Sequence, residues 1–269
     1  MRKVYIQNLG MIVTNNCTLN CGHCLRGCSS NTKMSKEVIE ATFNQTIAIG
    51  NLCLCGGEPT LALDVIENIF RYVVENRILV NQVSMTINGT NYSLEFLKLL
   101  DYINDYIPRN NTIFTISYDR YHQQELERLN ILKTYIENIN KYSESKYFYG
   151  LRKLEKNLKL FREGNAENLD SSLTIDLRPI DIVITYIGKS SKFNKDGLYN
   201  IGPLMAVNTE GIITEENTSI EHQRTLYNYG TVFHNTFEEV ALRQGRIVKP
   251  KKWNRETGKI MRKYTTYNR

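Results

Sequence analysis

Short apolar segments alternate with longer helix-like segments over the first 187 residues, and this alternation most limits the possible folds. Predicted strands cover 10–16, 51–55, 83–87, 112–117, 146–149 and 181–187. Predicted helices cover 36–49, 61–76, 93–106, 123–141 and 151–163, with apolar residues at three- and four-residue intervals. Strands that alternate with helices favour parallel βαβ units, so we expect an α/β fold.

The first four predicted strands all run into polar or glycine residues. Strand 51–55 is followed by Gly56-Gly57, strand 83–87 by Asn88-Gly89, and strand 112–117 ends at Ser117. The carboxyl ends of parallel strands meet at one edge of a sheet, where sites are commonly built. We therefore expect the functional site at this edge.

The pattern changes after residue 187. A polar stretch leads to a predicted hairpin over 205–214, turning at Glu210-Gly211, and to a closing helix over 236–244. Three regions follow: a core over 1–187, a hairpin and helix completing the fold over 188–245, and a tail over 246–269.

The tail is strongly basic. It holds nine Lys and Arg residues and one acid, Glu256, so its net charge is +8. The whole chain has a net charge of +6, so the residues before the tail carry −2. Its weak apolar periodicity predicts partial disorder. Basic residues interleaved with Trp253 and tyrosines could contact RNA, and a solvated tail is the plainer interpretation.

Nothing in the sequence predicts a membrane or secreted protein. The first 16 residues lack a continuous apolar stretch, and no run of 18 apolar residues occurs. A cytoplasmic location is therefore expected, where thiols stay reduced. All six cysteines fall within the first 55 residues, which favours metal or redox chemistry over a disulfide framework.

Three of these cysteines have a distinctive spacing. Cys17, Cys21 and Cys24 form a C-x3-C-x2-C motif directly after the first predicted strand. Three thiolates on one loop can hold three corners of an iron–sulfur cubane and leave the fourth iron free. The motif resembles that of the radical S-adenosylmethionine (SAM) superfamily, whose fourth iron is chelated by the amino and carboxylate groups of SAM.

Further residues carry the same resemblance. The second strand ends in Gly56-Gly57-Glu58-Pro59, the third in Asn88-Gly89, and the fourth in a segment with Ser117, Asp119 and His122. The resemblance implies that Gly56, Gly57, Glu58 and Pro59 lie at the methionine part of SAM, with Glu58 accepting from its ammonium group. It places Asn88, Ser117 and Asp119 at the ribose or amino group. His122 is expected to act as a general acid or base or to contact substrate, and capping of the following helix is an equal alternative.

The family resemblance also implies a fold and a mechanism. The fold would be a partial (β/α)6 TIM-like barrel with a short C-terminal extension. A flavodoxin- or ferredoxin-type donor would reduce the [4Fe–4S] cluster, and SAM would be cleaved to methionine and a 5′-deoxyadenosyl radical that abstracts hydrogen from the substrate. The enzyme would then be an oxidoreductase.

The other cysteines leave alternatives open. Cys28 extends the motif to a fourth cysteine, which allows a ferredoxin-like cluster or a structural zinc site without SAM chemistry. Neither alternative explains the Gly-Gly-Glu-Pro segment. Cys53 and Cys55 lie two residues apart on a predicted buried strand, and the plainer interpretation is that they are small buried thiols. The alternative hypothesis is that they bind a second cluster.

The sequence leaves three classes of substrate open. The segments 204–211, Gly230 and 237–240 are similar to the C-terminal part of SPASM-type members, although the cysteines that would bind their extra clusters are absent from this sequence. This similarity favours a peptide or protein substrate. A small metabolite or nucleotide is the second class, and RNA is the third.

Overall fold

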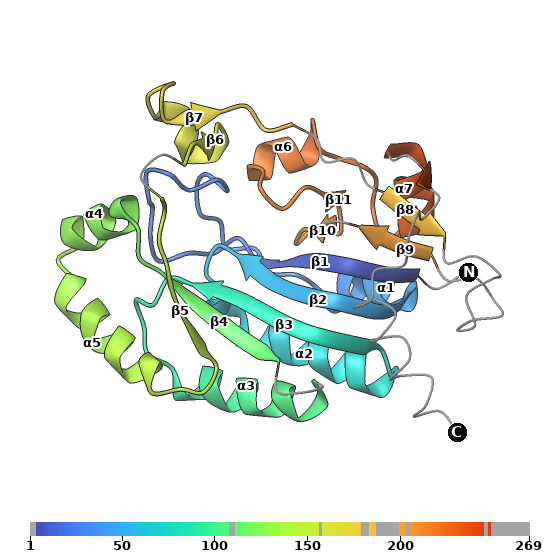
Figure 1. Ribbon diagram of the computed structural model, residues 1–269, viewed down its shortest axis with the longest axis horizontal. Helices are drawn as coiled ribbons and strands as arrows, with labels where there is room; N and C mark the ends of the chain where they lie inside the picture. The colour runs from blue at the N-terminus through green and yellow to red at the C-terminus, as the bar shows by residue number, and fades with distance from the viewer. Residues whose placement is uncertain are drawn as a thin grey trace.

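The computed structural model describes residues 4–107, 111–155, 158–178, 183–186, 199–202, 205–244 and 247–248. Its main feature is a sheet of ten strands with the path β12-β8-β9-β1-β2-β3-β4-β5, to which β10 and β11 are attached through β1 (Figure 1). The strands are β1 (Val4–Thr14), β2 (Thr46–Gly56), β3 (Leu79–Ile87), β4 (Thr112–Ser117), β5 (Phe148–Arg152), β8 (Val183–Tyr186), β9 (Tyr199–Gly202), β10 (Met205–Val207), β11 (Ile213–Thr214) and β12 (Ile247–Val248). The first five strands run parallel, so their carboxyl ends meet at one edge.

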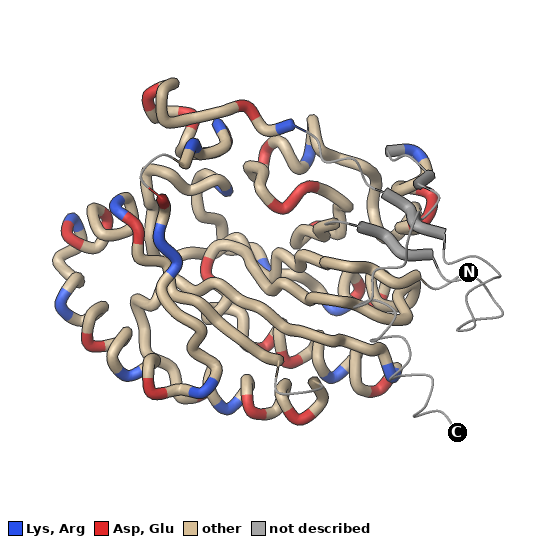
Figure 2. Tube along the Cα trace, viewed as in Figure 1, with Lys and Arg blue, Asp and Glu red and all other residues tan. Residues whose placement is uncertain are grey.

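Helices cover the outer face of this sheet. They are α1 (Lys36–Asn44), α2 (Leu63–Glu75), α3 (Leu94–Tyr106), α4 (Arg120–Arg128) and α5 (Leu132–Ser143). The inner face of α2 buries Val65, Ile66, Ile69, Phe70 and Val73, as its apolar periodicity predicts. Lys, Arg, Asp and Glu residues occur along these helices, whereas few occur in the strands (Figure 2). The architecture confirms the predicted α/β class and the partial TIM-like barrel.

Three predicted helices need correction. The helix predicted over 36–49 ends at Asn44, because the β-branched Thr46, Ile47 and Ile49 belong to β2, which pairs with β1. The helix predicted over 123–141 is two helices: it breaks at Asn130, which has a φ of 56°. Asn tolerates this left-handed conformation and commonly ends helices.

The charged helix predicted over 151–163 is wrong for the residues described there. β5 continues to Arg152, whose carbonyl accepts a hydrogen bond from the Tyr118 N–H at 2.9 Å. Leu160–Phe161 forms β6, which pairs with β7 (Thr174–Ile175). Strand pairing thus outweighs a local helix preference, as tertiary context commonly does. Of the strand predicted over 181–187, the structure describes Val183–Tyr186, which form β8.

The C-terminal part adds strands to the sheet beside β1. β10 runs parallel to β1 and antiparallel to β11, which confirms the predicted hairpin. The short α6 (Ile220–Arg224) and the closing α7 (Phe237–Gln244) follow, and Figure 1 shows α6 with β6 and β7 on the side of the sheet opposite α2 and α3. The basic tail lies outside the described residues from 249 onward. Within the described part of the chain, helices are too short or too polar to cross a bilayer.

Candidate active site

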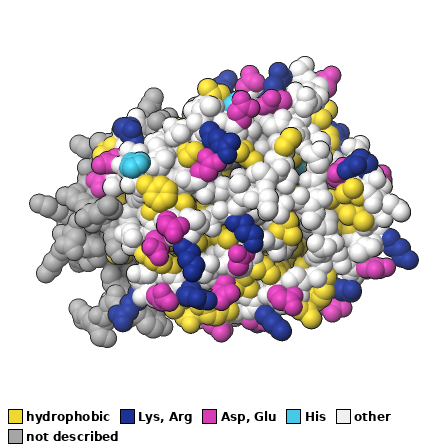
Figure 3. All heavy atoms as spheres, turned by 180° about the vertical axis from the view of Figure 1, so that it is seen from behind, with side chains coloured by type: hydrophobic (Ala, Val, Ile, Leu, Met, Phe, Trp, Pro, Cys, Tyr) yellow, Lys and Arg dark blue, Asp and Glu magenta, His cyan; other side chains and the backbone are white. Residues whose placement is uncertain are grey.

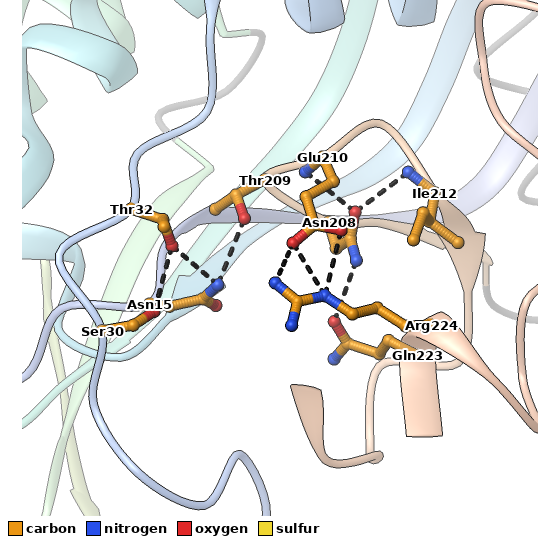
Figure 4. Close-up of polar contacts among 9 residues, drawn as sticks. All are labelled: Asn15, Ser30, Thr32, Asn208, Thr209, Glu210, Ile212, Gln223 and Arg224. Atoms are coloured by element: carbon orange, nitrogen blue, oxygen red, sulfur yellow. Dashed lines mark hydrogen bonds and ion pairs between the residues drawn. The ribbon is translucent and has the colours of Figure 1, made fainter. Parts of the chain in front are cut away.

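The loop between β1 and α1, residues 15–35, carries four of the six cysteines, and we call it the cysteine loop. Asn15 anchors its start: the side-chain Nδ2 donates to Thr32 Oγ1 at 2.9 Å and to Thr209 Oγ1 at 3.1 Å (Figure 4). On the other side of this contact, Asn208 Oδ1 accepts from the backbone N–H groups of Glu210 and Ile212 and holds the hairpin turn (Figure 4). The cysteine loop is therefore tied to the C-terminal hairpin.

The three motif cysteines line one cavity. Its volume is about 260 Å³, and it opens at the carboxyl ends of β2, β3 and β4. Its wall is formed by Cys17, Leu19, Cys21, His23, Cys24, Leu25, Arg26, Cys55, Gly56, Gly57, Thr86, Ile87, Asn88, Ser117, Asp119, His122, Arg152, Leu154, Leu160, Glu216 and Asn217. The structure thus gathers most of the residues that the sequence singled out.

The thiols of Cys17 and Cys21 sit in a poorly solvated, negatively charged setting. Burial raises the pKa of Cys17 to about 11, and burial together with the neighbouring thiols and carboxylates raises the pKa of Cys21 well above its ordinary value. Thiols of this kind hold their protons unless a cation replaces them, since metal binding requires thiolates.

The three motif thiols are spread more widely than the thiolates around a single zinc ion. Among the described residues, only Glu163, Glu167 and His222 form a set of three donors all within 4.8 Å of one another, so the three motif thiols are spread more widely. A single zinc holds its thiolates about 4 Å apart, because Zn–S bonds are about 2.3 Å long. Cys28, the fourth cysteine of the zinc alternative, is exposed.

Gly56 and Gly57 seat the end of β2 on the end of β1. A Cβ at Gly56 would lie 2.2 Å from the Thr14 carbonyl oxygen, and one at Gly57 would lie 2.3 Å from that of Asn16. The Gly57 N–H donates to Thr14 O at 2.7 Å, and the Glu58 N–H donates to Asn16 O at 2.7 Å. The glycines are thus required for close backbone packing beside the cysteine loop, and both also line the cavity.

Glu58 and Pro59 are buried in the protein rather than lining the cavity. Glu58 Oε1 accepts from the Thr60 N–H at 3.0 Å and from its hydroxyl at 2.6 Å, and Oε2 accepts from the Asn88 N–H at 2.6 Å. Burial raises the pKa of Glu58, and these hydrogen bonds oppose the rise. The carboxylate therefore links the end of β2 to the end of β3.

Asn88 connects the end of β3 to the cysteine loop. Its Nδ2 donates to Thr18 Oγ1 at 2.9 Å and lies 3.8 Å from Cys17 Sγ, while its Oδ1 accepts from the Thr90 N–H at 2.9 Å. Its carbonyl oxygen lies 2.9 Å from His122 Nε2. Asn88 is only 8% exposed, so it forms a firm part of the cavity wall.

Ser117, Asp119 and His122 lie at and beyond the end of β4. Asp119 caps α4 by accepting from the Tyr121 and His122 N–H groups, and its other oxygen lies 3.1 Å from His23 Nε2. Burial acts to raise the pKa of Asp119, but its hydrogen bonds to His23 and to the α4 backbone outweigh burial and lower it. His122 is 2% exposed, burial lowers its pKa, and its Nδ1 lies 3.7 Å from Cys21 Sγ.

Sequence reasoning missed a segment that supports the cysteine loop. Gly164, with a φ of 56°, packs so closely that a Cβ there would lie 2.7 Å or less from atoms of Cys24, Leu25 and Gly27. The Asn165 N–H donates to Cys24 O at 2.9 Å, and its Nδ2 donates to Cys21 O at 3.0 Å. The pair Gly164-Asn165 is a turn signal in the sequence, but nothing local indicates its partner.

It also missed the polar residues on the rest of the wall. Arg26, Arg152, Glu216 and Asn217 all face the cavity. Arg26 follows the last motif cysteine by two residues, which could have suggested its position. Glu216 and Asn217 come from the loop after β11 and are brought in only by the tertiary fold.

Two archaeal proteins are similar in sequence to most of this chain. A protein of Pyrococcus abyssi named "Probable GTP 3′,8-cyclase" is 29% identical over 239 residues, covering 82% of this chain and 71% of its own length. A protein of the same name from Pyrococcus horikoshii is 27% identical over 212 residues, covering 74% of this chain and 63% of its own.

Solved structures also resemble this one. Native anSMEcpe with bound AdoMet and Cp18Cys peptide aligns with a TM-score of 0.48 at 16% identity, over 88% of this chain and 80% of that one. Streptococcus suis SuiB bound to its precursor peptide SuiA aligns with a TM-score of 0.40 at 12% identity, over 88% and 64%.

The sequence model of the Radical SAM superfamily matches residues 11–159, which run from β1 through β5 and include the cysteine motif and the Gly-Gly-Glu-Pro segment. This match covers more than half of the chain and confirms the resemblance that the motifs predicted. The chain belongs to the radical SAM superfamily.

Proposed function

We propose that Cys17, Cys21 and Cys24 hold a [4Fe–4S] cluster and that SAM binds beside it in the same cavity. The observation that carries this proposal is the convergence of three thiols and the ends of β2, β3 and β4 on one wall. When bound, the cluster and SAM supply a 5′-deoxyadenosyl radical by one-electron reductive cleavage, with the electron from a flavodoxin- or ferredoxin-type donor, and the radical abstracts hydrogen from the substrate.

The chain's own residues orient the cofactors in this proposal. Gly56 and Gly57 offer backbone atoms to the methionine part of SAM, while Glu58 and Pro59 fix that backbone from behind. Asn88, Ser117 and Asp119 provide polar groups for the ribose or amino group. Hydrogen bonds to neighbouring residues hold two of these groups: Glu58 accepts from the Asn88 N–H, and Asp119 accepts from the Tyr121 and His122 N–H groups. They support this role, because a site works best when its binding groups are already held in place.

His122 acts in this account as a positioning residue. Its two ring nitrogens face Cys21 Sγ and the Asn88 carbonyl oxygen, and its ring packs 5.4 Å from the ring of Tyr135. A ring held on both sides has little freedom to move protons to a substrate. We infer that His122 fixes Cys21 and the end of β3 relative to each other.

The substrate has two leading candidates. A peptide or protein is favoured by the sequence similarity of 204–211 and 237–240 to SPASM-type members. A nucleotide is favoured by the two Pyrococcus relatives, both named for a reaction of GTP, and by the guanidinium groups of Arg26 and Arg152 on the cavity wall.

RNA remains a third candidate that depends on the basic tail. On the described surface seen in Figure 3, Lys and Arg are interspersed with Asp and Glu, so this face does not suggest a basic binding surface. A salt-sensitive RNA complex that weakens on deletion of 246–269 would support this candidate. Unchanged RNA affinity after the deletion would rule it out.

Iron and sulfide content tests the cluster assignment. Proteins with Cys17→Ala, Cys21→Ala or Cys24→Ala, reconstituted without oxygen, should each hold far less than four irons. The matched control is Cys28→Ala, which removes an exposed thiol of the same loop and should keep a full cluster. Loss of the metal in Cys28→Ala, with zinc in the unmodified protein, would instead support the four-cysteine zinc site.

A further inference from the structure

Three side chains of metal-ligand type lie close together outside the cavity. Glu163, Glu167 and His222 each offer one donor atom, and these atoms all lie within 4.8 Å of one another. Glu163 directly precedes the 3₁₀ helix η3 (Gly164–Asn168), Glu167 lies within η3, and His222 belongs to α6. The fold thus brings together donors from two segments that are distant in the sequence.

Two of these side chains are already held in place. The Glu163 side chain is 4% exposed, and its Oε2 accepts from the Ser219 N–H at 2.9 Å and lies 2.8 Å from His222 Nδ1. The His222 ring also lies edge-on to the Tyr227 ring, with 6.3 Å between the centroids. Glu167 is exposed, so its carboxylate has room to turn toward the other two. Supporting contacts of this kind orient metal ligands before the metal arrives.

Neighbouring cations do not balance the negative charge of this group. Two carboxylates count as two negative charges at neutral pH, and one imidazole can offset at most one of them. Arg162 and Arg224, the arginines closest to these residues in sequence, pair with other carboxylates, as Figure 4 shows for Arg224. Within the described part of the chain, Glu163 forms its ion pair with His222, and Glu167 forms none. Excess negative charge at a buried carboxylate is costly, so the group favours a bound cation.

The donor types suit a divalent transition-metal ion. Carboxylate oxygens and an imidazole nitrogen are ligands that Mn²⁺, Fe²⁺ and Zn²⁺ accept. Bonds of about 2.0–2.2 Å place two ligand atoms of one such ion roughly 3–4 Å apart. The present separations run from 2.8 Å between Glu163 and His222 to at most 4.8 Å, so small shifts of the exposed Glu167 side chain complete the set.

Both segments that supply the donors also hold the cysteine loop. Asn165 of η3 donates to the Cys24 carbonyl oxygen at 2.9 Å. At the start of α6, the Ile220 N–H donates to the Arg26 carbonyl oxygen at 3.3 Å, and Arg26 Nη1 donates to the Thr218 carbonyl oxygen at 3.0 Å. A contact that fastens η3 to α6 therefore steadies the cysteine loop from outside.

We propose that Glu163, Glu167 and His222 bind one divalent transition-metal ion, which fastens η3 to α6 beside the cysteine loop. His222 binds through Nδ1, the nitrogen that faces Glu163. Water fills the remaining positions, since three protein donors leave at least one open. The ion is separate from the cluster, because none of the three donors lines the cavity.

A manganese titration tests this site in the full chain. The protein is loaded with its cluster without oxygen, freed of other metals on a chelating resin and titrated with Mn²⁺, and the free ion is measured by its EPR signal. Mn²⁺ suits the test because it favours carboxylate and water ligands over thiolates. One Mn²⁺ per chain should bind at micromolar concentration. A variant with Cys17, Cys21 and Cys24 all changed to Ala should bind it equally.

Substitutions assign the ion to its donors. Glu167→Gln changes an exposed side chain and should leave the fold intact, yet weaken Mn²⁺ binding by about tenfold or more. His222→Gln should abolish stoichiometric binding. The matched control is Glu221→Gln, which removes the same charge from an exposed residue next to His222 and should bind like the unmodified protein. Mn²⁺ should raise the melting temperature of the control and of the unmodified protein, and should raise that of Glu167→Gln far less.

Three results would overturn the proposal. The first is no stoichiometric Mn²⁺ binding to the unmodified protein, or binding that Glu167→Gln and His222→Gln leave unchanged. The second is equal weakening by Glu167→Gln and Glu221→Gln, which would show a general attraction of cations to acidic residues. The third is loss of Mn²⁺ binding in the triple cysteine variant, which would place the ion at the cysteine motif.

Discussion

Glu58 Oε2 accepts a hydrogen bond from the backbone N–H of Asn88 at 2.6 Å, and this bond joins the end of β2 to the end of β3 behind the cavity wall. The same carboxylate accepts two hydrogen bonds from Thr60. Glu58 thus supports the site from within the protein, although its motif position suggested a direct contact with SAM.

Glu58→Gln should destabilise the fold. A glutamine has one acceptor oxygen, so its NH2 group would face an N–H donor of either Thr60 or Asn88, and one buried donor would lose its partner. We expect a loss of about 1–3 kcal/mol in the free energy of unfolding, measured by urea titration. Glu67→Gln, on the exposed face of α2, should change it by less than about 0.5 kcal/mol. Similar values for both variants would refute the linking role.

Gly57→Ala should disturb the junction between β1 and β2. The added Cβ would lie 2.3 Å from the Asn16 carbonyl oxygen, which is backbone and cannot move aside cheaply. A loss of about 1–3 kcal/mol in unfolding free energy is expected, together with a lower iron content after reconstitution. Gly22→Ala is the matched control within the cysteine loop, because a Cβ there meets nothing within 4 Å. A tolerated Gly57→Ala would contradict the packing argument.

Asn165→Ala should weaken cluster retention. The substitution removes the Nδ2 hydrogen bonds to Cys21 O and to Asn20 Oδ1, which hold the middle of the cysteine loop. Groups that support metal ligands typically contribute about tenfold or more to metal affinity. The rate of iron release to a chelator should therefore rise by about that factor. Asn168→Ala, whose side chain is exposed, should release iron at the original rate.

Asp119→Asn should change how stability depends on pH. Although burial opposes it, the contacts with His23 and the α4 backbone lower the pKa of Asp119, so its contribution is present above the unfolded pKa and is lost as pH falls through the folded pKa. The variant should be less stable by about 1 kcal/mol near neutral pH. The difference should shrink below about pH 4.

Urea titrations of the cluster-free protein at several pH values measure this effect. Asp105→Asn, on the exposed side of α3, is the control and should follow the unmodified protein throughout. A stability difference between Asp119→Asn and the unmodified protein that stays constant down to pH 2 would show that the ionised carboxylate is not responsible.

Much of the site could be predicted because its residues follow strand ends. Cys17, Asn88 and Ser117 come directly after or at the end of parallel strands, and parallel strands end at one edge. Periodicity located α2 and α3 nearly to the residue. The local sequence pattern predicted helix wrongly where pairing with distant strands decides the secondary structure, as for Thr46 to Ile49 in β2 and Leu160 in β6.

Contacts between distant segments could not be read from the sequence. Gly164-Asn165 supports the cysteine loop across about 140 residues, and Glu216 reaches the wall beside Cys53 from the loop after β11. Neither segment carries a motif. The assignment of Glu58 to SAM stays a prediction, and the burial of its side chain could not be read from the motif, which gives the residue type and not the direction of the side chain.

Production of 5′-deoxyadenosine tests the central claim most directly. The protein is reconstituted with iron and sulfide without oxygen, supplied with SAM and dithionite, and compared with Cys21→Ala and Cys28→Ala. The account predicts 5′-deoxyadenosine from the unmodified protein and from Cys28→Ala, and its loss in Cys21→Ala. No 5′-deoxyadenosine from an unmodified protein that holds a full cluster would contradict it.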